Sequence, residues 1–229
     1  KIVPGEISLA HLGILCLDEL PEFNRGVLEA LRQPLDSGMV TISRVASTAT
    51  LPCRFQLVAT ANPCPCGMKG QGECVRCKSK GKENMTCDCG GIRSSLCKCS
   101  AAKADGYLRK LSGPLLDRID MIVEMSGLTV SEMSEGEQES SEAVQKRVDR
   151  AIRMQAARGC RNSAIPFGEL EKYCELGVGA GKAFEKSSDG LSGRRCNRLL
   201  KVARTVADLI GRETVNEEDI KEAANYVKG

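Results

Sequence analysis

The sequence predicts a mixed α/β region followed by an all-α region. Two continuous apolar runs, at residues 13–17 and 55–61, have the aliphatic character of strands that a parallel sheet buries on both faces. From about residue 140 onward, the apolar residues recur only at the spacing of amphipathic helices. A mixed part followed by a helical part is typical of two successive domains, and 229 residues are enough to bury a core in each.

Composition and charge exclude several classes of protein. Hydrophobic residues make up 41% of the chain and charged residues 28%, as in ordinary soluble domains. No apolar run approaches the length of a membrane-spanning helix, and the first residues, Lys-Ile-Val-Pro-Gly-Glu, lack the apolar segment of a signal peptide. We therefore expect a cytoplasmic protein with no membrane partner. The net charge of +3 is too small to indicate nucleic-acid binding by itself.

The first half of the chain alternates between helix and strand signals. Residues 1–12 predict a short helix or turn, and a helix after residue 19 keeps its apolar spacing until Pro34 ends it. The elements expected further along are a β-hairpin over 39–45 and 48–55, a strand over 55–61, a helix over 105–118, a third strand over 119–125 and a Ser/Glu/Gly-rich linker.

The second half is predicted to be helical throughout. The candidate helices cover residues 140–158, 167–176, 180–187, 192–211 and 216–227. The 192–211 segment carries a broad apolar face, which indicates a helix packed against a core. Asn216 can cap the last helix, and Asp219 three residues later completes an imperfect capping box.

Two adjacent acids, Asp18 and Glu19, directly follow the first apolar run. Ligand chemistry in α/β sheets lies just beyond the carboxyl ends of the strands, and two carboxylates there suit a nucleotide site. Asp18 would hold the Mg²⁺ that bridges phosphates, as the second acid of nucleoside triphosphatases does, and Glu19 would polarise the attacking water. The plain structural alternative is a strand end followed by a solvated turn.

Several longer strings carry a resemblance to a known family. They are the segment from Pro4 to Phe23, Leu-Glu-Ala-Leu-Arg-Gln-Pro-Leu (28–35), Val-Thr-Ile-Ser-Arg (40–44), Ala-Asn-Pro-Cys-Pro-Cys-Gly (61–67), Leu-Ser-Gly-Pro-Leu-Leu-Asp-Arg-Ile-Asp (111–120) and Lys-Val-Ala-Arg-Thr-Val-Ala-Asp-Leu (201–209). Together they resemble the magnesium-chelatase-like AAA+ ATPases, and the ComM/YifB branch in particular. The segment around Asp18 resembles that family's Walker B region.

The resemblance implies a fold and a division of the chain. The fold class is α/β: residues 1–126 would form the C-terminal part of a P-loop AAA+ parallel-sheet core, with a β-hairpin and a Cys-rich insert at 64–99. Residues 127–139 would be a linker, and 140–229 an all-α lid. The family also implies ATP and Mg²⁺ as cofactors and a homo-oligomeric ring, a hexamer in the expected form.

The resemblance further implies roles for individual residues. Asn62 matches sensor 1, which hydrogen-bonds the attacking water or the γ-phosphate; its structural alternative is an Asn that caps a turn before a proline. Arg118 matches the arginine finger, which stabilises transferring charge in a neighbouring subunit; its alternative is a helix-end Arg paired with Asp117 or Asp120. Arg194 matches sensor 2, and the adjacent Arg195 is the competing assignment.

One part of the family pattern is missing from this chain. The P-loop sequence Gly-x4-Gly-Lys-[Ser/Thr], whose backbone amides cradle phosphates, does not occur. The nearest match, around Lys182, has Leu176 and Ala183 at two required positions and falls in the helical region. Because the family's P-loop precedes its Walker B segment, we expect it upstream of Lys1 and expect this chain alone to be inactive as an ATPase.

Eight of the thirteen cysteines lie between residues 64 and 99 in a near-repeat of close pairs. Cytosolic thiols stay reduced, and clusters of them more often bind metal. Four thiolates suit tetrahedral Zn²⁺, which predicts two zinc sites, with a single site or redox-active thiols as alternatives. The expected ligand sets follow the order of the chain: Cys64, Cys66, Cys74 and Cys77 for one ion, and Cys87, Cys89, Cys97 and Cys99 for the other.

The expected function of the full-length protein is a ring ATPase that drives DNA translocation or branch migration, as the ComM branch implies. The hairpin over 40–54, with Arg44 and Arg54, is the candidate element that touches DNA phosphates. One alternative is a true chelatase subunit that drives Mg²⁺ insertion into a porphyrin. The other is a non-enzymatic, zinc-bearing interaction module.

Overall fold

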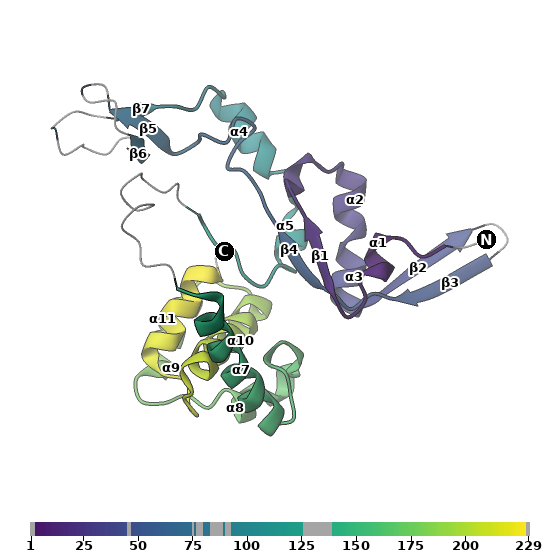
Figure 1. Ribbon diagram of the computed structural model, residues 1–229, viewed down its shortest axis with the longest axis vertical. Coiled ribbons are helices and arrows are strands. Elements are labelled where there is room, and N and C mark those ends of the chain that lie inside the picture. The colour runs from purple at the N-terminus through teal and green to yellow at the C-terminus, as the bar shows by residue number, and fades with distance from the viewer. Residues whose placement is uncertain are drawn as a thin grey trace. The chain divides into compact units, whose positions relative to one another are not determined.

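The computed structural model describes residues 3–44, 47–74, 76, 80–82, 89, 93–125 and 139–227. The chain divides into two compact units (Figure 1). The first contains the described residues up to Ile119, and the second contains the described residues from Asp120 onward. Residues 120–125, which the sequence assigns to the first domain, therefore belong with the helical unit. Among the described helices, none is both long enough and apolar enough to cross a membrane.

The centre of the first unit is a pair of parallel strands. β1 (Ile14–Leu17) pairs in register with β4 (Gln56–Ala59), as the two apolar runs predict. One face of the pair packs on a leucine-rich core with α1 (Glu6–Leu9), η1 (Leu20–Glu22), α2 (Arg25–Ala30), α3 (Arg32–Ser37) and α5 (Gly113–Leu116) nearby. The other face carries Ile14, which is 61% exposed, and Val58, which is 44% exposed. The expectation of strands buried on both faces is therefore met on one face only.

The helix expected to stop at Pro34 has a different form. The segment breaks at Leu31 into α2 and α3, and Pro34 lies inside the first turn of α3. A proline is tolerated there because the first-turn N–H groups have no partner within the helix. The prediction that Pro34 ends the helix was wrong. Gly38, in the left-handed conformation with φ +65°, ends α3 instead, and its N–H donates to Pro34 O at 2.9 Å.

A β-hairpin follows α3 directly. β2 (Met39–Arg44) pairs antiparallel with β3 (Ser47–Pro52), with Met39 opposite Pro52 and Arg44 opposite Ser47. Two cross-strand hydroxyl pairs join its strands, Thr41 with Thr50 at 3.2 Å and Ser43 with Thr48 at 3.0 Å. The hairpin predicted from alternating β-branched residues is present.

The Cys-rich segment contains a small antiparallel sheet. β5 (Gln71–Cys74) lies between β6 (Lys80–Lys82) and β7 (Arg93–Ser95). Gly72 is opposite Gly81 on one side and opposite Ser95 on the other. Because β5 and β7 run antiparallel, the chain that enters β5 and the chain that leaves β7 meet at the same end of this sheet.

The segment after the sheet departs from the sequence-based expectation twice. The helix expected over 105–118 is two helices, α4 (Ala101–Leu108) and α5, because Ser112 caps a new start at Gly113-Pro114. Residues 119–125 form no strand, so the predicted third strand was wrong. An apolar run becomes a strand only beside a strand edge, whereas Ile122 N–H donates at 2.9 Å to Tyr226 O in the helical unit.

The helical unit confirms the helices predicted from apolar periodicity. Its elements are α7 (Ser141–Ala157), η2 (Asn162–Ala164), η3 (Phe167–Glu169), α8 (Leu170–Tyr173), α9 (Ala180–Ser188), α10 (Gly193–Ile210) and α11 (Glu217–Tyr226). The apolar face of α10 packs with α9 and α11 in one core cluster. Asn216 N–H donates to the Asp219 carboxylate at 2.9 Å, as the capping box requires.

A buried polar network joins α7, η2 and α10 inside this unit. Asp208 and Arg204 are both 0% exposed and pair at 3.1 Å. Arg158 donates to both oxygens of the Asp208 carboxylate, and Asn162 Nδ2 donates to it at 2.8 Å. Arg204 also donates to the carbonyl oxygens of Arg212 and Glu213. The charges inside this core are thus paired and hydrogen-bonded, the condition under which proteins bury them.

Candidate functional site

The carboxyl ends of β1 and β4 bring the predicted acids and the predicted amide together. Leu17 and Ala59 are register partners at the ends of the two strands. Asp18 and Glu19 follow the first strand, and Thr60 and Asn62 follow the second. All four residues are exposed. Parallel pairing therefore places residues more than forty positions apart in sequence at one edge of the sheet, which is where α/β proteins bind ligands.

Thr60 connects the two acids. Its hydroxyl donates to the Asp18 carboxylate and accepts from the Glu19 N–H at 2.9 Å. Its own N–H donates to Leu17 O at 3.0 Å, and its carbonyl accepts from Leu20 N–H at 2.8 Å. Both backbone groups and the side chain of Thr60 thus hold the turn that carries the acids.

Sequence reasoning missed Thr60. The signal that could have found it is the register itself, because a hydroxyl at the first position after the second strand lies opposite the first acid after the other strand. Glu19 adopts the left-handed conformation, with φ +50° and ψ +50°. A non-glycine residue in that region costs of order 1–3 kcal/mol and persists where surrounding contacts enforce it, often at functional sites.

Asn62 contacts the acid to which its predicted role is linked. Its Nδ2 lies 3.4 Å from Glu19 Oε1, a long hydrogen bond. An amide that donates to this carboxylate orients it, and the same nitrogen can donate to an oxygen ligand in its place. The contact joins the two turns that follow β1 and β4, and the sensor role of Asn62 remains a prediction from the resemblance.

Arg118, two residues after the end of α5, is held by contacts within its own unit. Its guanidinium donates to Pro114 O and forms an ion pair with Asp36 on α3, and the Arg118 side chain is only 15% exposed. The sequence alternatives were pairs with Asp117 or Asp120. Arg118 forms its ion pair with Asp36, and Asp120 pairs with Arg198 at 3.1 Å in the helical unit. Asp36 was not singled out from the sequence.

Arg194 and Arg195 begin α10 in the helical unit. Ser192 caps this helix, and its hydroxyl accepts from Arg195 N–H at 3.4 Å. Arg194 is exposed and Arg195 is half-buried. These residues and the acids after β1 belong to different units, so the assignment of sensor 2 remains a prediction from the resemblance.

Four cysteines of the described segment converge on one point. Their Sγ atoms all lie within 4.8 Å of one another, and they come from Cys64, Cys66, Cys97 and Cys99. The Sγ of Cys64 is 3.4 Å from that of Cys66 and 3.7 Å from that of Cys97. A tetrahedral zinc site with bonds of about 2.3 Å has sulfur atoms roughly 3.8 Å apart. The donor set and spacing therefore fit Zn²⁺.

Hydrogen bonding favours the thiolate form at Cys66, while desolvation and hydrogen bonds with the Cys66 and Cys64 sulfur atoms raise the pKa of Cys97. Backbone N–H groups of Met68 and Lys98 hydrogen-bond the Cys66 sulfur and, with further help from Cys64, lower its pKa to about 6. Lys69 lies nearby and is paired with Asp105 at 2.8 Å. A thiolate, not a thiol, is the metal ligand, so at least one donor of the cluster is prepared for a cation.

The grouping of these cysteines differs from the sequence prediction. Cys64 and Cys66 were expected to share an ion with Cys74 and Cys77, but they lie beside Cys97 and Cys99. The antiparallel pairing of β5 and β7 is the reason, since it joins the outer ends of the segment rather than neighbours in sequence. The predicted partition into consecutive sets is corrected for these four residues.

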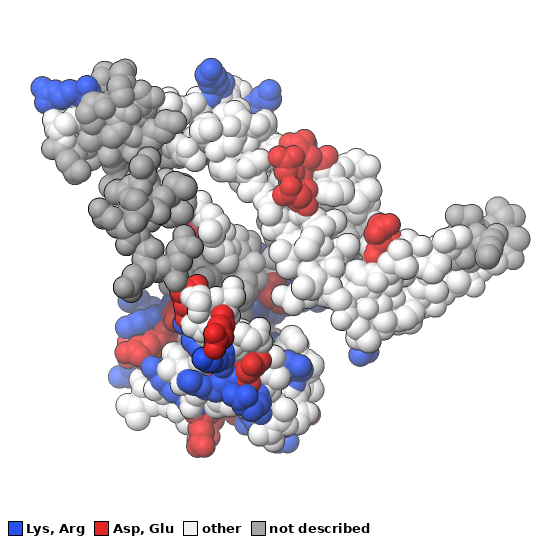
Figure 2. Space-filling view, in the orientation of Figure 1, with Lys and Arg blue, Asp and Glu red and all other residues white. Residues whose placement is uncertain are grey.

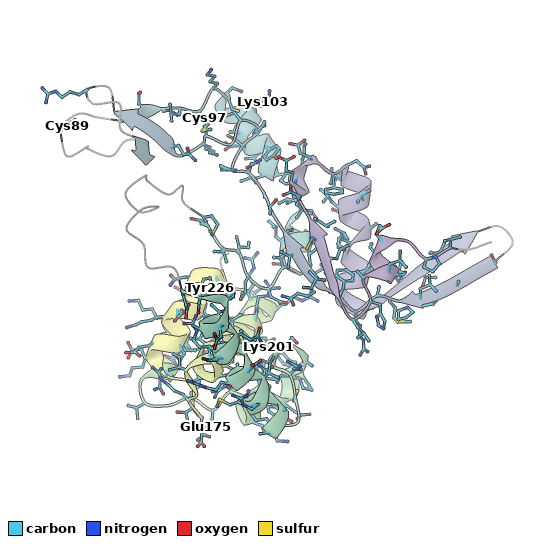
Figure 3. The ribbon with its side chains drawn as sticks, in the orientation of Figure 1. Cys89, Cys97, Lys103, Glu175, Lys201 and Tyr226 are labelled. Carbon is cyan, nitrogen blue, oxygen red and sulfur yellow. The ribbon has the colours of Figure 1, made fainter. Side chains whose placement is uncertain are left out.

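The other four cysteines are only partly covered. Cys77 and Cys87 lie outside the described residues, and only the backbone of Cys74 is described, as the last residue of β5. The Cys89 carbonyl oxygen accepts from Arg76 at 2.9 Å. Cys89 and Cys97 lie toward opposite ends of the β5–β7 sheet in Figure 3. A second metal site formed from these four residues remains a sequence prediction.

The hairpin lacks carboxylates and is rich in hydroxyl groups. No Asp or Glu occurs between Asp36 and Glu73, whereas Arg44 and Arg54 fall in that interval. The described side chains of the two strands show no carboxylate on the face seen in Figure 2. Arg54 lies at the base, where its side chain approaches Gly38 and its N–H donates to His11 Nδ1 at 3.1 Å.

Comparison with known proteins identifies relatives over the length of the chain. Residues 1–86 and 83–133 match the family model described as magnesium chelatase, subunit ChlI, and residues 138–227 match the one for the ChlI C-terminal region. The chain is 39% identical to an uncharacterized protein, YifB, of Salmonella typhimurium and 40% identical to competence protein ComM of Haemophilus influenzae. A protein of Mycobacterium tuberculosis is 35% identical.

Each alignment covers 97% of this chain but only 40 to 41% of the relative. The chain thus spans less than half the length of these proteins. The small parallel sheet and the helical C-terminal unit are consistent with the fold of the matched family. The matches to both family models and the sequence identities to these relatives show that the chain belongs to the magnesium-chelatase-like family that includes ComM and YifB.

Proposed function

We propose that this chain supplies the water-activating and sensing part of an ATPase site in the full-length protein. The observation that carries the proposal is the linked set Asp18, Thr60, Glu19 and Asn62 at the carboxyl ends of two parallel strands. Membership in the magnesium-chelatase-like family supports ATP hydrolysis as the reaction. Two carboxylates and an amide suit phosphoryl transfer to water, in which positioning and charge stabilisation do most of the work.

Each residue has a defined task in this proposal. Asp18 provides carboxylate oxygens, the ligands Mg²⁺ prefers, and Thr60 fixes the rotation of that carboxylate. Glu19 accepts a hydrogen bond from a water molecule and orients that water for attack. Asn62 donates to Glu19 until ATP binds, and then donates to a phosphate oxygen. Bound MgATP would supply the electrophilic phosphorus and the cation. The phosphate cradle would come from a P-loop in another part of the full-length protein.

Arg118 acts in trans in the proposed ring. A guanidinium stabilises the charge that spreads over the transferring phosphoryl group, and such a residue contributes roughly 10³–10⁵ in turnover. Arg194, at the start of α10, would contact the γ-phosphate in its own subunit. A hexameric ring remains part of this proposal and rests on the family, in which neighbouring subunits complete each other's sites.

The proposed substrate of the ring is DNA, which would be translocated or branch-migrated. Phosphate contacts in protein–DNA complexes come from Arg and Lys, hydroxyl side chains and backbone N–H groups. The acid-free stretch between Asp36 and Glu73, with paired Ser and Thr hydroxyls along the hairpin, offers these groups. Insertion of Mg²⁺ into a porphyrin is the second candidate, favoured by the description of the family model.

Zinc has a structural task in the proposal. Cys64 is 0% exposed and lies two residues after Asn62, so a metal bound to the four clustered thiols would anchor the chain that carries the amide. Metal binding can order a segment too polar to form its own core. We assign one ion to Cys64, Cys66, Cys97 and Cys99, and retain a second ion on the remaining four cysteines as the sequence-based part of the proposal.

The test is ATP turnover of the full-length protein and two variants that act at different subunits. Glu19→Gln should lower turnover by about 10² or more, because the amide cannot accept the proton or polarise water, while ATP binding stays. Arg118→Ala should also lower it strongly. A mixture of the two variants should recover activity, since some interfaces then contain both intact groups.

Arg109→Ala is the matched control. Arg109 is an exposed arginine at the C-terminal end of α4, in the same unit as Arg118. Mixed rings that form but recover nothing would contradict the assignment of Arg118 in trans. Stimulation of turnover by DNA, compared with stimulation by a porphyrin-binding protein, separates the two candidate substrates. This chain by itself should not turn over ATP; a rate on the order of 1 per second, low for an ordinary enzyme, would contradict the divided site.

A further inference from the structure

The ion pair between Asp36 and Arg118 joins the candidate finger to the end of α3. Arg118 has two hydrogen-bonding directions occupied: Pro114 O, one turn back, and the Asp36 carboxylate. With a side chain 15% exposed, Arg118 is held in a partly desolvated position in which a charge pair is screened less than at the surface. The place of the guanidinium therefore depends on the place of Asp36.

The same end of α3 forms the base of the hairpin. Asp36 is followed by Ser37, Gly38 and then β2 without any intervening loop. The Ser37 hydroxyl donates to Gln33 O at 2.9 Å and accepts from Met39 N–H at 3.2 Å. Gly38 O accepts from Cys53 N–H at 2.8 Å, which ties the returning strand to the same point.

Gly38 makes this junction tight. A Cβ at position 38 would lie 2.7 Å from Arg54 Cγ, and the residue needs φ +65°. Only glycine tolerates both conditions without strain. Helix end and hairpin base are thus hydrogen-bonded into one rigid piece, and a tilt of the hairpin has to move the Asp36 carboxylate.

From these contacts we propose that Asp36 is a positioning residue that couples occupancy of the hairpin by DNA to the arginine finger. DNA phosphates bound along β2 and β3 hold the hairpin in one orientation, the α3–β2 junction transmits that orientation, and Asp36 places Arg118 for the neighbouring subunit. The inference rests on the proposed function, because it needs both the DNA-binding hairpin and the finger. It adds a residue and a route by which the substrate controls hydrolysis.

The test is the ratio of DNA-stimulated to basal ATP turnover in the full-length protein, with a duplex oligonucleotide and a four-way DNA junction as probes. Asp36→Asn should lower this ratio about fivefold, the low end of the usual coupling between two sites, because the amide is isosteric but has lost the ionic bond. Asp36→Glu should restore most of the ratio. DNA affinity, measured by fluorescence anisotropy, should stay close to that of the wild type.

Glu29→Gln is the matched control. Glu29 forms its ion pair with Arg32, at 2.6 Å across the neighbouring helices α2 and α3, and not with Arg118. It should leave the ratio unchanged. A second variant tests the inference in case Asp36→Asn misfolds. Two glycines inserted between Gly38 and Met39 leave the ion pair in place but loosen the connection between α3 and the hairpin. This insertion should also lower the ratio of DNA-stimulated to basal turnover.

The outcomes separate this inference from the function on which it rests. A wild-type protein whose turnover ignores DNA would refute the DNA part of the proposed function, and the coupling with it. Stimulated wild-type turnover with an unchanged ratio in Asp36→Asn and in the glycine insertion would refute the coupling alone. Equal loss of basal and stimulated turnover leaves the ratio unchanged and would likewise overturn it, because it marks Asp36 as purely structural.

Discussion

The surroundings of Asp208 in the helical unit and of Asp18 and Glu19 at the sheet edge differ in how the carboxylates are hydrogen-bonded. Asp208 is 0% exposed in the helical unit and has charged or amide partners at both oxygens. Asp18 and Glu19 are exposed at a sheet edge, where one hydroxyl contacts both residues and a long hydrogen bond from Asn62 reaches Glu19. The first arrangement satisfies its charges internally. The second leaves oxygen lone pairs available and stores backbone strain at Glu19.

The difference teaches how to separate stability from function among carboxylates. A buried acid with complete hydrogen bonding is expensive to remove, because its partners are left charged inside the protein. An exposed acid in a strained turn contributes little to stability, and backbone strain of this kind is common at functional sites. The experiments below test this contrast, beginning with the largest expected effect.

The largest effect on stability should come from Asp208→Asn. Loss of the carboxylate leaves Arg204, which is 0% exposed, without its counter-charge, and removal of one partner from a buried pair typically costs about 3–5 kcal/mol. Asp18→Asn should change the free energy of unfolding by less than about 0.5 kcal/mol, as surface substitutions do. Urea unfolding of this chain, followed by circular dichroism, measures both variants; similar losses for the two would contradict the contrast.

Zinc removal should have a large but local effect. Elemental analysis of protein purified without added metal should find zinc, and Cys66→Ser should remove about one ion. Chelation should increase hydrogen exchange around Asn62 and the cysteine cluster while the helical unit keeps its protection. Binding should release protons and weaken at low pH, because the ligands must be thiolates. Metal-free protein with a fully ordered cluster would oppose this prediction.

Thr60→Val should have an intermediate effect on turnover in the full-length protein. Valine keeps the shape of threonine but removes the hydroxyl that joins Asp18 to Glu19. We expect about a tenfold fall in kcat, equivalent to one hydrogen bond of about 1.4 kcal/mol to a charged group, and a higher Mg²⁺ requirement. Thr60→Ser, which keeps the hydroxyl, should retain most activity. Equal losses in both variants would show that Thr60 acts through packing instead.

The smallest effect should come from an exposed acid outside both regions. Lys221 hydrogen-bonds Glu217 on α11 at 2.7 Å and lowers its pKa. A carboxyl group with a lowered folded-state pKa stabilises the fold above its unfolded pKa of about 4.3, and the contribution disappears as pH falls through the lower folded value. Glu217→Gln should therefore narrow the stability difference between pH 6 and pH 3 slightly. If Glu217→Gln lowered the free energy of unfolding as much as Asp208→Asn, the proposed difference between exposed and buried acids would be wrong.

Local sequence signals predicted much of the fold. The apolar runs around Leu15 and Leu57 became paired parallel strands, and the β-branched stretches became the hairpin. Helical spacing and the cap at Asn216 predicted the helices of the second unit, because their signals lie within one or two turns of chain. The adjacent acids after the first strand were recognised for the same reason.

Other features depended on which segments meet. The apolar run at 119–125 does not pair with a described strand, and the Ile122 N–H instead donates a hydrogen bond to Tyr226 O. Pro34 proved compatible with a helix once the chain broke at Leu31. The cysteines of one cluster come from both ends of the insert, and Asp36 pairs with Arg118, 82 positions further along the chain. No window of neighbouring residues contains these pairings.

The sequence by itself therefore determined the kinds of secondary-structure elements and the motifs shared with the family. It also supplied the candidate residues of the proposed site: two acids, an amide, an arginine and a set of thiols. Only the tertiary structure decided the partners: Thr60 for the acids, Asp36 for Arg118 and Cys97 with Cys99 for Cys64. The physical reason is that helix periodicity, strand alternation and caps are short-range properties of the chain, whereas strand register and ion pairs depend on contacts between distant segments, whose closure is set by the packing of the whole unit.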